Sequence, residues 1–546
     1  MRGVSGKVWV VLSDHIKPDQ ELVRKYGKFL AQLIANRGYE KEGDRVFDLK
    51  LRNLLPYTLL PNIEVGIERI QRAVREGKRI VIFGDYDADG ITGTAILYDI
   101  LRKAGAKVVP VLPTRETGYG LSRDLMHLFS RYGDLLITVD NGTSSVEEIE
   151  GCPLEVVVID HHNVPERVPE GCVIVNPRIS EDVPDQMREL SSSAVCFYMA
   201  AVLSRRLGLD IDVREYLDLV ALGTVGDVMP MNYINRILVH KGIKVLESVA
   251  RGVIEKPGIK ALLRVAGLNG RISAKDIAYS LAPRINAPGR IGDPMISLKL
   301  LIETDPKRAE MLAKKVEVLN AKRRAITESV YRSAYSMAVR RENESFLSLW
   351  DSGWHVGVLG IVAGRIAEAL GRPVAVFSMG ETRSVGSVRS VEGIDVYEGL
   401  KKISHLFIKW GGHPQAAGIT LESSRLEEFR RSAEEVFRSV RKEPPPLYVD
   451  MEMSPSSFTP EKFKEIDFLE PYGERNPFPT FLSERIEIKK VEYRQGKLFV
   501  DTGGVNMVCW DKRIFPYVER GKRTRVVYSV MDREFHLIDL EEDHGT

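Results

Sequence analysis

The sequence has few cysteines, no long apolar run and almost no net charge, and each of these absences excludes a class of protein. Its four cysteines, Cys152, Cys172, Cys196 and Cys509, are scattered without C-x-x-C spacing, which argues against a zinc site or a disulfide framework. The apolar run Val8 to Leu12 is too short for a signal peptide or a membrane span. A net charge of +2 does not by itself indicate a nucleic-acid or membrane partner. We therefore expect a cytoplasmic protein with no membrane segment.

The length and the alternation of patterns predict several domains. A chain of 546 residues with 44% apolar content is long enough for two to four of them. Strand and helix patterns alternate between residues 78 and 242, which is typical of an α/β domain with a parallel sheet. We place five segments along the chain: an N-terminal segment at 1–45, a catalytic α/β domain at 46–295, a long connecting helix at 296–345, a smaller α/β domain at 346–442 and a β-barrel at 447–546.

An acidic loop, GDYDADG at residues 84–90, follows the apolar run Ile80–Phe83. It places Asp85, Asp87 and Asp89 at alternate positions, and carboxylates this crowded repel one another unless they share a cation. An EF-hand loop begins in the same way but needs a glutamate at its twelfth position, where Ile96 stands. A Walker phosphate loop needs Gly-Lys-Ser/Thr after its glycines, which is missing here. The loop is either another kind of metal-binding loop or a solvated acidic turn.

Three further apolar segments also end in aspartate or histidine, and we predict them to be strands. Residues 135–139 precede Asp140 and Asn141, residues 156–159 precede Asp160, His161 and His162, and residues 219–226 precede Asp227. The carboxyl ends of parallel strands lie along one edge of a sheet, where ligands bind. Clustered carboxylates without basic partners favour bound cations. An oxygen-rich set with one or two imidazoles suits Mn²⁺ or Mg²⁺, with Zn²⁺ or Co²⁺ as alternatives in vitro, and its size suggests two ions.

The motifs GDYDADG, VDNG, IDHHN and GTVGD resemble, in order and in context, the four motifs of the DHH phosphoesterase superfamily. The resemblance implies the metal ligands Asp87, Asp89, Asp140, His161 and Asp227, with Asp85 as a further ligand or an orienting group. It implies a supporting role for Asp160 and places His162 against the scissile phosphate or the leaving oxygen. Phe83 stands where manganese pyrophosphatases carry a histidine, which argues against that branch.

Several polar residues outside these motifs are candidates for contact with phosphate, because guanidinium groups match phosphate oxygens. From the residues alone we select Arg115, Asn235, Arg236 and Arg290, although each could equally be an ordinary surface residue. Arg290 is preferred because the glycines and prolines around it predict a loop that approaches its neighbour closely.

Segments at 353–370, 386–390 (GSVRS) and 411–418 (GGHPQAAG) resemble the DHHA1 domain, which accompanies the DHH domain and grips the substrate. On its own, the glycine-rich segment could also be a turn around a buried histidine. The resemblance implies that Arg389, Ser390 and His413 bind nucleic-acid phosphates, with His355 near them.

The remaining segments predict a long helix and a small barrel. Residues 306–341 carry one apolar stripe at helical spacing and could form a spacer or one wall of a nucleic-acid channel. The short strands after residue 447 favour an OB-fold. Its aromatic residues Tyr493, Phe499 and Trp510 stand near several lysines and arginines, so they could stack on single-stranded nucleic acid or fill the barrel core.

Residues 468–481 resemble the start of the terminal domain in the RecJ family, and the order of all segments resembles that family over nearly the whole chain. The fold class that follows is α/β: a parallel-sheet DHH domain, joined by a long helix to a smaller α/β DHHA1 domain, with a C-terminal β-barrel. The implied function is a 5′→3′ exonuclease of DNA repair and recombination that degrades single-stranded DNA to mononucleotides with two Mn²⁺ or Mg²⁺ ions. Implied partners are single-stranded DNA, a single-stranded-DNA-binding protein and a helicase.

Two alternatives remain open. A DHH phosphodiesterase acting on short RNA or cyclic dinucleotides would lack the C-terminal barrel. A non-catalytic replication scaffold would have lost motif acids, whereas every one of them is present here.

Overall fold

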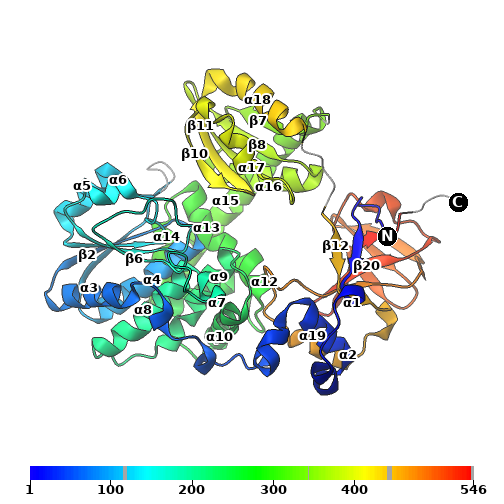
Figure 1. Ribbon diagram of the computed structural model, residues 1–546, viewed down its shortest axis with the longest axis horizontal. Coiled ribbons are helices and arrows are strands. Elements are labelled where there is room, and N and C mark those ends of the chain that lie inside the picture. Colours follow the sequence, from blue (N-terminus) through cyan, green and yellow to red (C-terminus); the bar gives the residue numbers. More distant parts are fainter. Residues whose placement is uncertain (115–119, 342, 440–444, 543–546) are drawn as a thin grey trace. The chain divides into compact units, whose positions relative to one another are not determined.

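The computed structural model describes residues 1–114, 120–341, 343–439 and 445–542 (Figure 1). The chain divides into two compact units. The larger unit comprises residues 42–321 and 468–477, and the smaller unit comprises residues 1–41, 322–467 and 478–546. Within the described residues, no helix combines the length and the apolar character needed to cross a membrane.

The larger unit is built on a sheet of five parallel strands in the order β3–β2–β4–β5–β6. The strands are β2 (Arg79–Gly84), β3 (Lys107–Val111), β4 (Leu135–Val139), β5 (Glu155–Ile159) and β6 (Val173–Val175). Because β3 and β4 lie on opposite sides of β2, the direction of the crossover connections reverses at β2. In an open α/β sheet a ligand crevice forms at such a point, outside the carboxyl ends of the strands.

Helices cover both faces of this sheet, as the period of two along a strand requires. Ile80 and Ile82 of β2 point into one buried cluster, and Val81 and Phe83 point into another on the opposite face. In Figure 1, α5 and α6 lie on one side of the sheet, and α3, α4 and α8 lie on the other. The helices of this unit are α3 (Ile63–Arg75), α4 (Ala88–Lys103), α5 (Arg123–Tyr132), α6 (Val146–Glu150), α7 (Asp185–Arg188), α8 (Ser192–Arg206), α9 (Leu217–Gly226), α10 (Tyr233–Ala250), α11 (Pro257–Val265), α12 (Ala274–Asp276), α13 (Ala282–Ile291) and α14 (Met295–Leu301).

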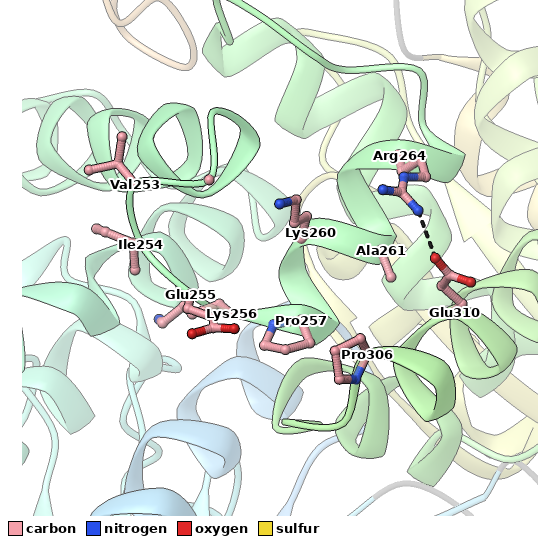
Figure 2. Close-up of a pocket in the computed structure, with 11 residues that line it drawn as sticks. Val253, Ile254, Glu255, Lys256, Pro257, Lys260, Ala261, Arg264, Pro306 and Glu310 are labelled. Atoms are coloured by element: carbon pink, nitrogen blue, oxygen red, sulfur yellow. Dashed lines mark hydrogen bonds and ion pairs between the residues drawn. The ribbon is translucent and has the colours of Figure 1, made fainter.

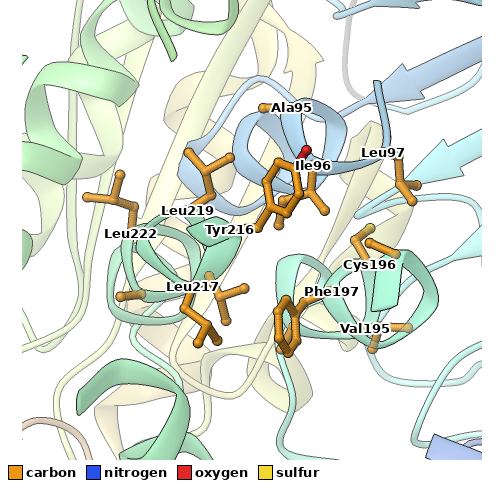
Figure 3. Close-up of a cluster of buried hydrophobic side chains, with 14 of the residues drawn as sticks. Ala95, Ile96, Leu97, Val195, Cys196, Phe197, Tyr216, Leu217, Leu219 and Leu222 are labelled. Carbon is orange, nitrogen blue, oxygen red and sulfur yellow. The ribbon is translucent and has the colours of Figure 1, made fainter. Parts of the chain in front are cut away.

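The helices α4, α8 and α9 pack tightly together beside the sheet. Figure 3 shows Ile96 of α4, Phe197 of α8 and Leu219 of α9 among the apolar side chains that they share. Their packing fixes the N-terminus of α4 and of α8 and the C-terminus of α9, and these are the helix ends that carry polar residues of the site described below.

Two local predictions were wrong. Residues 219–226 were expected to form a strand, but they belong to α9. This helix is apolar on every side because it is buried on every side, and a short run of that kind carries no period that separates a helix from a strand. The expected loop around Arg290 is the helix α13, which tolerates Pro283 in its first turn and contains Pro288.

The expected long helix is α15 (Pro306–Val339), and Val316 and Val330 of its predicted apolar stripe are buried. Ala313 and Val316 of its first half belong to the core of the larger unit, and Val330 and Ala334 of its second half belong to a core of the smaller unit. The helix is therefore an integral part of both cores.

The smaller unit contains an α/β part with the strand order β10–β11–β9–β8–β7, of which only β7 and β8 are parallel. Its elements are β7 (Leu347–Asp351), α16 (Leu359–Leu370), β8 (Val374–Met379), β9 (Arg383–Arg389), α17 (Val396–Lys401), β10 (Phe407–His413), β11 (Ala416–Glu422) and α18 (Leu426–Arg438). Apolar residues of α16 pack on one face of the sheet, and those of α17 and α18 pack on the other.

The C-terminal β part of the smaller unit has a seven-stranded sheet, in the order β13–β14–β20–β21–β18–β17–β16, and a two-stranded ladder of β15 and β19. Its elements are β12 (Leu447–Val449), β13 (Met451–Glu452), α19 (Pro460–Asp467), β14 (Thr480–Leu482), β15 (Ile486–Glu487), β16 (Lys490–Arg494), β17 (Lys497–Asp501), β18 (Asn506–Cys509), β19 (Arg523–Thr524), β20 (Val526–Met531) and β21 (Glu534–Leu540).

The N-terminal segment is built into this β part, which no local sequence pattern predicts. Strand β1 (Trp9–Val11) pairs in parallel with β12, and the Trp9 indole donates a hydrogen bond of 2.9 Å to Asp539 of β21. The short helix α1 (Leu12–His15) and then α2 (Gln20–Asn36) follow, and the Phe29 ring of α2 stacks on Phe481 at 6.0 Å.

Candidate metal centre

The acidic loop lies at the carboxyl end of β2 and leads into α4. Asp87 is the N-cap of α4, where its Oδ1 accepts hydrogen bonds from the backbone amides of Asp89 at 3.0 Å and Gly90 at 3.1 Å. Asp89 is in the first helical turn and is fully buried, and Asp85 is buried as well. The loop therefore directs three carboxylates toward the crevice end of the sheet.

Asp140 follows β4 and has a left-handed backbone conformation, with φ of 66°. Aspartate tolerates this region better than most residues, and such backbone strain concentrates at functional sites. The turn is held by Asn141, whose side-chain amide donates to the Val139 carbonyl at 2.9 Å, and by Thr138, whose hydroxyl donates to the Asn141 carbonyl at 2.8 Å.

The Asp-His-His segment follows β5. Asp160 Oδ1 accepts from the backbone amide of His161 at 2.8 Å and lies 2.8 Å from Nδ1 of His162, and Asp160 Oδ2 accepts from the backbone amide of Thr143 at 3.0 Å. The side-chain amide of Asn176 donates to the His162 carbonyl at 3.0 Å. Asp160 therefore holds the backbone of this segment at His161 and orients the ring of His162.

Asp227 reaches the site from a helix. It caps the C-terminus of α9, and α9 comes close enough to α4 that a Cβ built on Gly223 would lie 2.5 Å from Asp89 Oδ1. A glycine is needed at that crossing, which explains why the segment GTVGD combines glycine with an acidic end.

These residues meet around Asp140. The ligand atoms of three groups each lie within 4.8 Å of one another: Asp85, Asp87 and Asp140; Asp140, His161 and His162; and Asp89, His161 and Asp227. His161 Nε2 lies 3.2 Å from Asp140 Oδ1 and 3.3 Å from Asp227 Oδ2. Asp140 and His161 are the residues that connect the groups, so the arrangement suits two neighbouring cations.

The cluster carries an excess of negative charge, because its carboxylates have few basic neighbours. Burial raises the pKa of Asp140 well above its usual range, and the charges of Asp87, Asp89 and Asp227 raise that pKa further. The pKa of Asp227 is raised by burial and by Asp87 and Asp89 in the same way. Bound divalent cations would offset this repulsion.

The pKa values of the two histidines are shifted in opposite directions. Burial lowers the pKa of His161, which keeps its imidazole neutral, as a metal ligand must be. Burial also acts to lower the pKa of His162, but its hydrogen bond to Asp160 and the surrounding carboxylates raise that pKa to about 9. For Asp160, burial acts to raise the pKa, yet the hydrogen bonds from His162 and Thr143 hold that pKa well below its usual range. Asp160 and His162 therefore form an ion pair, while His161 remains available as a ligand.

The residues present fit a pair of divalent cations. Neither ring nitrogen of His161 makes a hydrogen bond within the described residues, although both are buried. An orphaned buried nitrogen is rare in a folded protein unless it binds an ion or water. Its carboxylate neighbours provide the oxygen-rich surroundings that Mn²⁺ and Mg²⁺ select.

The predicted phosphate contacts of Asn235 and Arg236 need correction, because both side chains are fully buried. The Arg236 guanidinium donates to the carbonyls of Val46, Phe468, Leu469 and Glu470 at 3.1–3.4 Å. The Asn235 amide donates to the carbonyls of Glu189 and Pro230. Both residues hold segments of the larger unit together and face no substrate.

Arg290 lies beside the acidic loop, whereas Arg115 falls outside the described residues. A Cβ on Gly289 would lie 2.5 Å from the carbonyl oxygen of Tyr86, so α13 crosses the loop closely at the residue that precedes Arg290. The close approach expected there is present, although a helix provides it.

The four candidates in the smaller unit gather at one end of its α/β sheet. In the β ladder, Arg389 of β9 lies opposite Ala416 of β11, and Ala416 in turn lies opposite the exposed His413 of β10. The backbone amide of Ser390 donates to the Gln415 carbonyl at 2.9 Å, and its hydroxyl donates to the Ile394 carbonyl at 2.6 Å. The exposed His355 caps the turn before α16, and a Cβ on Gly360 at the start of that helix would lie 2.8 Å from Arg389 Nη2. The residues implied by resemblance thus form one cluster.

Two serines at the start of α8, which are not among the predicted site residues, contact the metal cluster. The backbone amides of Ser192 and Ser193 donate to the two oxygens of Asp89 at 2.6 and 3.0 Å. The Ser192 hydroxyl donates to Asp140 Oδ1 at 3.0 Å. A run of serines before an apolar helix is an N-cap signal, but nothing local indicates what the amides bind.

A separate cavity of about 480 Å³ lies between the loop before α11 and the start of α15 (Figure 2). Arg264 and Glu310 in its wall form an ion pair at 2.7 Å, and Lys256 Nζ lies 2.9 Å from the buried Asp218 carboxylate. None of the predicted site residues that lie in the described part of the chain lines this cavity.

Comparisons with known proteins agree with the order of these parts. Family models match residues 79–224 (DHH family, N-terminal domain), 343–439 (DHHA1 domain) and 449–536 (RecJ OB domain). A single-stranded-DNA-specific exonuclease RecJ from Dickeya dadantii is 34% identical, with 85% of this chain and 84% of that protein covered. The protein of that name from Thermus thermophilus is 35% identical, with 85% of this chain and 68% of that protein covered.

Solved structures are similar over nearly the whole chain. Thermus thermophilus RecJ in complex with Mn²⁺ has a TM-score of 0.85 at 29% identity, covering 98% of this chain and 80% of that one. The same protein with Mg²⁺ has a TM-score of 0.77 at 28% identity, covering 98% and 79%. The predicted fold class is confirmed.

Proposed function

The chain belongs to the RecJ family of DHH phosphoesterases, and from this premise we propose that it is an exonuclease that degrades single-stranded DNA to mononucleotides from the 5′ end. It is a metal-dependent hydrolase, as its family is. The observation that carries the proposal is the convergence of carboxylates and His161 on Asp140 at the crevice end of the parallel sheet.

The ligand assignment follows from the groups that the side chains form. Asp85, Asp87 and Asp140 would hold one Mn²⁺ or Mg²⁺ ion, and Asp89, His161 and Asp227 would hold the other, with Asp140 near both. Held by these residues, two such ions would supply an activated water and positive charge beside the phosphoryl oxygens. Asp85 was expected to be either a ligand or an orienting group. Because it lies in one group with Asp87 and Asp140, we propose it as the third ligand of that ion.

His162 supplies a proton donor. Asp160 takes the hydrogen bond of Nδ1, so Nε2–H of this half-exposed imidazolium is the atom left to donate to a phosphoryl oxygen or to the leaving 3′ oxygen. Asp160 keeps the ring charged and correctly turned, and it is thus a positioning residue.

The cluster of Arg389, Ser390, His413 and His355 would bind the phosphates of the substrate strand, with Arg290 serving the same purpose beside the acidic loop. Guanidinium groups provide paired donors for phosphate oxygens. Such contacts recognise the backbone and carry no sequence preference.

The outer face of strands β16–β18 would bind bases. Cross-strand pairing places Phe499 opposite Val508 and Glu492 on one face of the sheet. By alternation along the strands, Trp510 and Lys497 share this face, and Lys497 Nζ lies 3.7 Å above the Trp510 ring. Tyr493 pairs with the buried Leu498 on the opposite face and contacts Phe515. Exposed aromatic rings next to cations are suited to stacking with single-stranded nucleic acid.

The alternatives are weakened by specific features. A phosphodiesterase for short RNA or cyclic dinucleotides does not require the C-terminal β part, and a non-catalytic scaffold does not require the complete set of motif acids.

Such a nuclease would act in DNA repair and recombination in the cytoplasm. A helicase and a single-stranded-DNA-binding protein, which would expose and present its substrate, are the partners that this activity needs.

The test is a degradation assay with Mn²⁺ on end-labelled substrates. Single-stranded DNA carrying a 5′ or a 3′ label, duplex DNA, short RNA and a cyclic dinucleotide are compared. We expect labelled mononucleotides to appear first from the 5′-labelled single strand. Early release from the 3′ label would reverse the polarity, and cleavage of only the RNA or the cyclic dinucleotide would support the first alternative.

A further inference from the structure

We propose that the Ser192 hydroxyl is a positioning group that sets the orientation of the Asp140 carboxylate for metal binding. This inference rests on the metal-ligand role proposed above for Asp140. The hydroxyl donates to Asp140 Oδ1 at 3.0 Å, and both side chains are almost completely buried.

Asp140 depends on this bond for its orientation. Among the described residues, Ser192 is the one hydrogen-bond donor to its carboxylate. His161 Nε2 is close to the same oxygen, at 3.2 Å, but it makes no hydrogen bond there. A carboxylate that belongs to two of the three ligand groups has to present its oxygens in two directions, and a fixed donor on Oδ1 restricts its rotation.

The helix end that carries this hydroxyl is held in place by bonds of its own. Ser191 caps α8 by accepting from the Ala194 amide at 3.2 Å, and its hydroxyl lies 3.0 Å from that of Thr224 on α9. The backbone amide of Ser192 donates to Asp89 Oδ2 at 2.6 Å. One residue on a fixed helix end therefore contacts Asp140 through its side chain and Asp89 through its backbone.

The side chain and the backbone of Ser192 can be tested separately. Ser192→Ala removes the hydroxyl bond to Asp140 but keeps the bond from the backbone amide to Asp89. We expect this variant to bind Mn²⁺ more weakly by on the order of 10-fold to 100-fold, the usual effect of losing an outer-shell partner of a metal ligand. Isothermal titration of the metal-free protein with MnCl₂ measures this directly. The Mn²⁺ concentration for half-maximal nuclease activity should shift in parallel, and Ser192→Thr, which keeps the hydroxyl, should restore much of the affinity.

The matched control is Ser204→Ala, which also replaces a buried serine of α8 but whose hydroxyl bonds the Ala201 carbonyl. It should leave Mn²⁺ affinity unchanged, and thermal melting of both metal-free variants measures any general loss of stability. If the wild type binds Mn²⁺ and Ser192→Ala binds it equally well, the positioning role is wrong. If the wild type itself binds no Mn²⁺, the metal centre proposed above is at fault instead.

Discussion

Gly223 on α9 faces Asp89 on α4 so closely that a Cβ at position 223 would lie 2.5 Å from the Asp89 carboxylate oxygen. The two residues are 134 positions apart, and their contact is what brings Asp227 into the cluster from the end of a helix. This crossing joins the packing of the core to the geometry of the site.

Gly223→Ala should therefore damage both stability and metal binding. Helix propensity alone would make this substitution stabilising by up to about 1 kcal/mol, whereas overpacking a buried contact destabilises by about 1–3 kcal/mol. We expect the overpacking to outweigh the gain in helix propensity, because the new methyl group would lie 2.5 Å from both Asp89 Oδ1 and Thr92 Oγ1. Urea denaturation and Mn²⁺ titration measure the two effects. Gly364→Ala in α16, where the nearest side-chain atom lies 3.9 Å away, is the helical control and should not destabilise.

Asp140→Asn and Asp227→Asn should abolish activity and leave the fold intact. Each replacement keeps the shape of the side chain and removes one negative charge from a cluster that already repels itself. We expect nuclease activity on single-stranded DNA with Mn²⁺ to fall by more than about 100-fold, beyond the range for an outer-shell partner. Circular dichroism should show an unchanged fold. Full activity in either variant would refute the ligand assignment.

Arg236→Met should destabilise the protein without affecting substrate affinity. Removing the guanidinium takes one donor from four carbonyl groups, in hydrogen bonds that are buried for Val46 and Leu469 and partly buried for Phe468 and Glu470, and we expect a loss of about 2–4 kcal/mol in the free energy of unfolding. The exposed Arg214, paired with Asp212, provides the control, since Arg214→Met should change stability by less than about 0.5 kcal/mol. A raised KM for DNA at unchanged stability would restore the phosphate-binding role for Arg236.

Trp510→Ala should weaken the binding of single-stranded DNA by about 1–3 kcal/mol, the usual contribution of one stacked base. Fluorescence anisotropy with a labelled oligonucleotide, in the presence of Ca²⁺ to avoid cleavage, measures this. Tyr493→Ala is the matched comparison, because it truncates an exposed ring on the opposite face of the same sheet. Equal losses from the two variants would mean that the outer face is not the binding surface.

The acids of the site were predictable because each follows a strong local pattern. An apolar run that ends in aspartate at the carboxyl end of a parallel strand places that aspartate at the crevice edge, whatever the details of the packing. This reasoning located Asp85, Asp87, Asp89, Asp140 and the Asp-His-His segment. It also located Asp227, although for a wrong reason, since the segment before it is a buried helix.

The phosphate-contact candidates were less predictable, because the local sequence around an arginine does not show whether its side chain is buried or exposed. Arg236 is fully buried against main-chain carbonyls, while Arg290 stands one residue beyond a close crossing of helix and loop. The local patterns around the two residues are equally plausible, and only the burial of each distinguishes them.

The class of fold, the order of its parts and the chemistry of its acidic motifs follow from the amino-acid sequence, because periodicity and strand ends are local properties of the chain. Which side chains contact one another depends on the tertiary structure. It placed the amide and hydroxyl of Ser192 on Asp89 and Asp140, brought Gly223 against Asp89, and paired strand β1 with β12 more than 430 residues away. Such contacts depend on how distant elements pack, and no short stretch of sequence encodes them.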